Sequence, residues 1–137
     1  MHCFVGRRAL IWGLLPFCFL QVACNQGKRT VTVTGSVLKS GQPIPLSPTG
    51  AVEVTLLPDV GDDMAYTTRV ARCEKDGSFR IPDVVPGKYK LGVQQNDPNP
   101  QTDKLNGAFR AGDSKIVVNI DGKAPLNIDL AKPNLGQ

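Results

Sequence analysis

Residues 31–37 read VTVTGSV, and this stretch decides the expected fold. Its valines occupy odd positions and its hydroxyl-bearing residues occupy even positions. Because successive side chains of an extended chain point to opposite faces, the stretch predicts a β-strand with one apolar face and one polar face.

The same alternation recurs along the chain, separated by turn signals such as Asp76-Gly77 and Asp121-Gly122. The further predicted strands are centred on residues 52–56, 66–73, 79–81, 89–93, 116–120 and 126–130. Residues 95–112 keep no hydrophobic period and predict a long loop. No segment after residue 23 shows a helical period. We therefore predict an all-β fold, a seven-stranded antiparallel β-sandwich of the immunoglobulin or transthyretin-like kind, although closure into a barrel fits the same alternation.

The first 23 residues have the organisation of a secretory signal peptide. Arg7 and Arg8 precede an apolar run from Ala9 to Leu20. As a helix this run would span about 18 Å, too short for a bilayer core of roughly 30 Å. The Arg7-Arg8 pair also fits the twin-arginine export route, although its neighbours match that motif poorly. We therefore expect an exported protein.

The signal closes with Leu20-Gln21-Val22-Ala23-Cys24, which resembles the lipobox of bacterial lipoproteins. In that family the cysteine is lipidated, and the resemblance implies a membrane anchor at Cys24. Gln21 departs from the usual Leu. The alternative is that Cys24 is incidental and the product is soluble. The expected organisation is a signal peptide (1–23), a spacer (24–29), one β-sandwich domain (30–132) and a tail (133–137).

Three segments resemble the carboxypeptidase regulatory-like domain, a transthyretin-like β-sandwich of exported bacterial proteins. They are Val33–Val37 with Gly41–Ile44, Asp76–Ile81 and Val84–Leu91. The turns at Asp76-Gly77 and Pro86-Gly87 predict that Phe79 and Tyr89 enter the core, with the Tyr89 hydroxyl near the rim. Short signal-bearing chains of this kind are similar to small lipoproteins of planctomycete-like bacteria. The resemblance is to an accessory domain and implies no peptidase activity.

Composition argues against several functional classes. Removing Arg7 and Arg8 with the signal lowers the 16 Lys and Arg to 14, against 12 Asp and Glu. The remaining basic residues are scattered, so we expect no nucleic-acid binding. The single histidine, His2, lies in the signal, so a mature Ser-His or Cys-His pair is excluded. We expect no enzyme and no cofactor. Cys73 is expected to pack as a small hydrophobe.

Asp59, Asp62 and Asp63 form the best candidate for a metal site, because Ca²⁺ prefers several oxygen ligands on a flexible loop. Solvated loop carboxylates are the alternative. For sugar binding, Tyr66 and Phe109 are the only aromatic residues of the mature chain expected to be free of the core.

Two functions remain. The leading hypothesis is a non-catalytic lipoprotein of the cell envelope, anchored to the membrane through Cys24 and acting as an interaction or scaffold module for an envelope protein or glycan. The alternative is a soluble secreted carbohydrate- or calcium-binding domain that uses the acidic loop and the excursion around residues 96–107.

Overall fold

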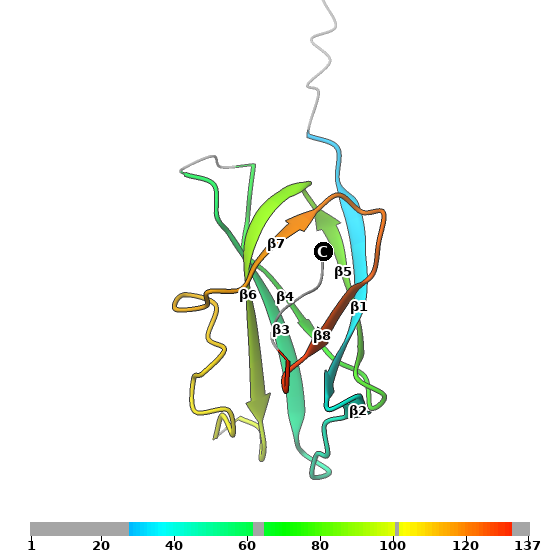
Figure 1. Cartoon of the computed structure of the whole chain (residues 1–137), viewed down its shortest axis with the longest axis vertical. Helices are drawn as coiled ribbons and strands as arrows, with labels where there is room; N and C mark the ends of the chain where they lie inside the picture. Colours follow the sequence, from blue (N-terminus) through cyan, green and yellow to red (C-terminus); the bar gives the residue numbers. More distant parts are fainter. Residues whose placement is uncertain (1–27, 62–64, 101, 133–137) are drawn as a thin grey trace, which may run out of the picture.

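Eight β-strands in two sheets make up the part of the chain that the structure describes, residues 28–61, 65–100 and 102–132 (Figure 1). The structure is a computed structural model. The strands are β1 (Val31–Lys39), β2 (Gln42–Pro43), β3 (Ala51–Pro58), β4 (Arg69–Arg72), β5 (Ser78–Val84), β6 (Gly87–Asn96), β7 (Val117–Ile120) and β8 (Leu126–Asp129). Sheet A contains β2, β1, β5 and β8, and sheet B contains β4, β3, β6 and β7. The expected all-β sandwich is confirmed.

All seven predicted strands are present, and the eighth is the two-residue β2. It pairs with the end of β1 and was not among the predicted strands. Ser40 and Gly41, the two central residues of this hairpin, have φ angles of 54° and 75°. Two positive φ values are typical of the tight hairpin turn that matches the strand twist. β4 is shorter than the predicted strand over residues 66–73, because its pairing with β3 covers only Arg69 to Arg72.

Sheet B is built around a long antiparallel pair, β3 with β6. The register aligns Val54 with Val93 and Leu56 with Leu91, and all four side chains are at most 1% exposed. Polar partners such as Glu53 and Gln94 meet on the other face. The alternation of apolar and polar residues in the sequence therefore matches the alternation of the two faces of this sheet, one buried and one polar.

The sheets are antiparallel with one exception: β8 runs parallel to β1. β7 ends in sheet B at the same end of the sandwich at which β1 begins in sheet A (Figure 1). The loop at residues 121–125 crosses between the sheets there, so β8 must start at that end and run in the direction of β1. The expectation of a wholly antiparallel sandwich therefore misses this pair.

The core lies between the sheets, and Phe79 and Tyr89 are 4% and 1% exposed, as expected. The Tyr89 hydroxyl donates to the carbonyl oxygen of Val85, 2.7 Å away, at the rim. A tyrosine that bonds back to the preceding corner is a feature of many β-sandwiches. This bond allows the Tyr89 ring to lie in the core while its hydroxyl group stays hydrogen-bonded.

The segment between β6 and β7 contains no named strand, in agreement with the predicted long loop, although β6 extends to Asn96 and so includes the first two predicted loop residues. The excursion lies against β6. The Val93 amide donates to Phe109 O, and the Leu91 amide donates to Ile116 O, both at 2.9 Å. A Cβ added at Gly92 would lie 2.6 Å from the Cβ of Ala111, so the excursion packs directly on the sheet.

Replacing Gly35 with alanine should destabilise the fold strongly. A Cβ at Gly35 would overlap the carbonyl oxygen of Leu126 and lie 2.7 Å from the Phe79 ring, so β8 or Phe79 must move. We expect a loss of about 3 kcal/mol in the free energy of unfolding. Denaturant titration measures it. Gly112→Ala is the matched control, because a Cβ there meets nothing within 4 Å, and an equal loss in both variants would contradict the close approach.

Candidate functional site

The sandwich has two ends with different contents (Figure 1). At the N-terminal end, β1 begins beside the end of β5, and the loop at residues 121–125 follows β7. At the far end, β3 begins beside the end of β6, with the loop at residues 44–50 and the first part of the excursion. β6 connects the two ends over ten residues, about 30 Å.

A buried carboxylate, that of Asp97, binds two loops together at the far end of the sandwich. Asp97 is only 3% exposed. It accepts hydrogen bonds from the Ser47 amide at 3.2 Å and from the Ser47 hydroxyl, and it forms an ion pair with Lys104 Nζ at 3.0 Å. Gly50 leaves room for this carboxylate, since a Cβ there would lie 2.9 Å from Asp97 Oδ1.

These bonds join two loops that are far apart in sequence. Ser47 belongs to the β2–β3 loop, whereas Lys104 belongs to the excursion, and Asn99 N also donates to Thr49 O at 3.3 Å. The hydrogen bond from the Ser47 hydroxyl, followed by the bond from Lys104, lowers the pKa of Asp97 below its ordinary value of 3.8. Hydrogen bonds to the ionised form favour that form. Sequence patterns did not predict this site, because they showed only polar residues in a loop.

Asp97→Asn should lower thermal stability near neutral pH and flatten its dependence on acid. A carboxyl group whose pKa is lower in the folded state stabilises the fold above its ordinary pKa, and this contribution is lost as the pH falls through the folded value. We expect the unfolding midpoints of the variant and the parent protein to differ most near pH 7 and to converge towards pH 2.

Circular dichroism melts across this pH range measure the effect. Asp113→Asn, a change at an exposed carboxylate of the same excursion, is the control and should leave the profile unchanged. Parallel curves for Asp97→Asn and the parent protein at every pH would contradict the role of the charge.

The candidate calcium ligands are not brought together by anything that the structure describes. Asp62 and Asp63 lie outside the described residues, and Asp59 is exposed at the N-terminal end, where its amide donates to Lys88 O at 2.9 Å. Among the described residues, no group of three His, Cys, Asp or Glu side chains could hold a metal ion. The calcium site stays a prediction. Asp59 and the excursion around residues 96–107 are separated by the length of β6, so they do not form one joint binding site.

The aromatic residues expected to be free are both packed against the core. Tyr66 lies 6.2 Å from Tyr89 between ring centroids, and its hydroxyl donates to Pro86 O at 3.2 Å. Lys28 Nζ sits 4.5 Å from the centre of the Tyr66 ring, a cation–π geometry. Phe109 is half-buried beside β6. Neither ring is an open stacking platform, and they contact different parts of the sandwich.

Cys73 packs against the core, as its apolar-patterned strand predicted. Burial, followed by the negative charges of Asp76 and Glu74, raises the pKa of its thiol to about 11. The thiolate is the reactive form of cysteine. Cys73 lines a hollow of about 780 Å³ at the far end, together with residues 43–48, Gly50, Arg72, Glu74 and Lys75.

In a variant without the other cysteines, Cys73 should react slowly with a thiol reagent near pH 8. Relative to a thiol at the reference value of 9.0, a pKa of about 11 leaves roughly one hundredth of the thiolate. Iodoacetamide labelling followed by mass spectrometry measures the rate, with urea-unfolded protein as the control. Equal rates in the folded and unfolded protein would contradict the protection.

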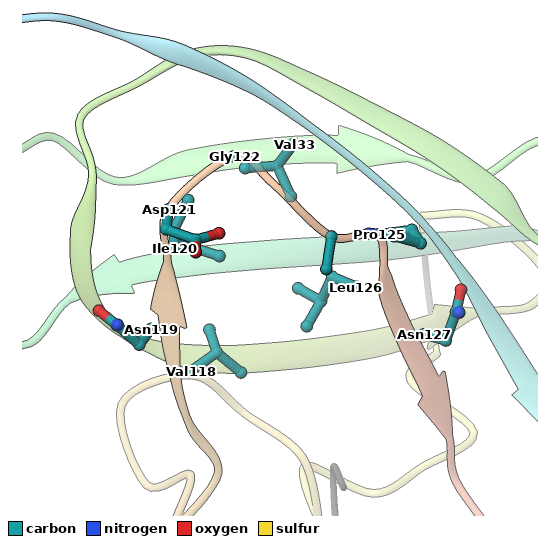
Figure 2. A pocket seen from close by; sticks show the side chains of 10 residues that line it. Val33, Val118, Asn119, Ile120, Asp121, Gly122, Pro125, Leu126 and Asn127 are labelled. Carbon is teal, nitrogen blue, oxygen red and sulfur yellow. The ribbon is translucent and has the colours of Figure 1, made fainter. Parts of the chain in front are cut away.

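A second hollow opens between the sheets on the side where β7 and β8 form the edges (Figure 2). Its volume is about 240 Å³. We call it the edge cleft. Its lining comprises Val33, Val118, Asn119, Ile120, Asp121, Gly122, Ala124, Pro125, Leu126 and Asn127. Figure 2 shows Leu126 across the cleft from Val118 and Ile120. Small-molecule pockets usually measure about 300–1,000 Å³, so this cleft suits side chains better than a ligand.

The proposed lipidation site, Cys24, lies outside the described residues. Comparison of the chain with models of protein families, with curated proteins and with solved structures finds no match in any of the three.

Proposed function

We propose that this protein is a non-catalytic lipoprotein of the cell envelope, held to a membrane through Cys24 and presenting the far end of its sandwich to an envelope protein or glycan. The observation that carries this proposal is the position of β1. The strand that follows the spacer is the central strand of sheet A, paired with β5 on one side and β8 on the other. A force on the anchored N-terminus would therefore be transmitted directly to the centre of sheet A.

The spacer is short, so a lipid anchor at Cys24 would restrict how the domain is oriented relative to the membrane. Lys28 already contacts Tyr66, and the four Cα–Cα steps from Cys24 to Lys28 span at most about 14 Å. An anchor at Cys24 would keep the N-terminal end near the bilayer, with the far end about 30 Å beyond it along β6. The far end also contains the larger hollow and the loops joined by Asp97. It is the surface that such an anchor would display.

The resemblance to the carboxypeptidase regulatory-like domain supports a module of the transthyretin-like kind. Its three segments fall on β1 with the β2 hairpin, on the turn into β5, and on the corner from β5 to β6. Each contributes a backbone reversal or a core side chain. We propose this family as the origin of the domain, which in other exported proteins is an accessory part without catalytic residues.

The anchor is tested by expressing the full chain with Cys24→Ser and separately with Gln21→Leu. We expect the parent protein to partition into the detergent phase, because each buried acyl methylene contributes about 0.8 kcal/mol. Cys24→Ser should move it to the aqueous phase. Gln21→Leu, which restores the usual lipobox residue, should preserve or increase the lipidated fraction. Mass spectrometry of the mature N-terminus is the readout, and an unmodified cysteine in the parent protein would contradict the proposal.

Presentation of the far end is tested by comparing two exposed substitutions in a cross-linking pull-down from envelope fractions. Pro48→Arg changes the lining of the far-end hollow. Thr32→Arg, on β1, is the matched control at the N-terminal end. We expect Pro48→Arg alone to lower recovery of a specific partner about tenfold, equivalent to roughly 1.4 kcal/mol. Equal recovery with both variants would remove the far end as the binding surface.

A further inference from the structure

The edge cleft is an apolar opening between two strands that are each paired on one side in the described structure. β7 pairs with β6, and β8 pairs with β1. Val33, Val118, Ile120 and Leu126 provide its apolar surface. Val33, Val118 and Ile120 are each no more than 6% exposed, whereas Leu126 is only half-buried. An apolar side chain would complete the packing here.

The chain reverses direction directly after β8. The Lys132 amide donates to the Asp129 carbonyl at 3.0 Å, and Asp129 Oδ1 accepts from the Ala131 amide at 2.9 Å. A carbonyl-to-amide bond between residues three apart defines a β-turn, and Asp is favoured at its first position. The turn therefore reverses the chain by Lys132, where the described part of the structure ends.

The turn also sets a register. With Asp129 opposite Lys132 as the last hydrogen-bonded pair, an antiparallel continuation places Asn127 opposite Asn134 and Leu126 opposite Leu135. Directly opposed residues point to the same face of a sheet. Leu126 points into the edge cleft, so a residue opposite it points there too. Leu135 is the one large apolar residue among residues 133–137.

We propose that residues 133–137, which lie outside the described part of the structure, add a strand to the outer edge of β8 and insert Leu135 into the edge cleft. Pro133 is compatible with this role, because proline is tolerated at the first residue of an edge strand. Leu135 follows Lys132 by three residues, about 10 Å of extended chain, which matches the return from Asp129 to Leu126.

A tail in this position would prevent strands of other proteins from pairing with the outer edge of β8. An exposed strand edge beside an apolar surface is a template for pairing with another chain. Covering β8 with the chain's own tail would leave the far end, and not this side, as the surface for partners. The inference stands independently of the proposed function, because it requires neither the lipid anchor nor a partner.

Paired cysteines in the full chain test the register, in a Cys73→Ala background. Leu126→Cys with Leu135→Cys should form a disulfide under mild oxidation, since opposed residues of a non-hydrogen-bonded pair have Cα atoms about 4.5 Å apart, a distance that a disulfide can span. Leu126→Cys with Asn134→Cys is the control, because residue 134 faces the other way. Peptide mapping by mass spectrometry should find at least a tenfold preference for the first pair within one chain.

Two single substitutions provide a readout that does not depend on the paired variants folding. Leu135→Asp should lower the thermal unfolding midpoint by about 5 °C, since it places a charge in an apolar cleft. Asn134→Asp should change it little. Equal shifts from both, equal cross-linking in both registers, or a 126–135 disulfide formed between two chains would overturn the proposal. The last result would assign the cleft to a second copy.

Discussion

The fold depends on the close approach of β8 to β1 at Gly35. There the backbone of one strand and the ring of Phe79 occupy the space that any side chain would need. β1 is thereby held between β5 and β8 and becomes the strand through which sheet A is assembled. It is also the first strand in the described part of the chain. The lipid anchor that we propose would therefore lead directly into the central strand of a sheet.

The two ends of the sandwich are stabilised by different chemistry. At the N-terminal end, aromatic contacts dominate: the Tyr89 hydroxyl bonds to the β5–β6 corner, Tyr66 packs against Tyr89, and Lys28 covers Tyr66. At the far end, the buried Asp97 carboxylate joins two polar loops. A buried charge that receives several hydrogen bonds fixes geometry, because each bond constrains the direction of its donor. This suits the far end for presenting a defined surface.

The edge cleft shows why strand pairing alone does not complete a β-sandwich. β4 and β5 lie close together and close one side, whereas β7 and β8 leave the other side open to apolar contact. Natural sheets protect such edges by covering, twisting or charging them. The β-turn from Asp129 to Lys132 reverses the chain where β8 ends, beside this exposed edge.

Much of the fold could be predicted from the sequence because its determinants are local. The alternation from Val31 to Val37 and its repeats identified seven strands and their buried faces, whereas export, inferred from the short apolar run after Arg7-Arg8, stays a prediction. The burial of Asp97, the packing of Tyr66 and Phe109, and the parallel placement of β8 were decided only in three dimensions. A period of two specifies which face of a strand is apolar, but not which strand lies beside it. The neighbour of each strand depends on where the chain crosses between the sheets. It also depends on which loops meet at one end, as the loops of Ser47 and Asp97 do although these residues are 50 positions apart.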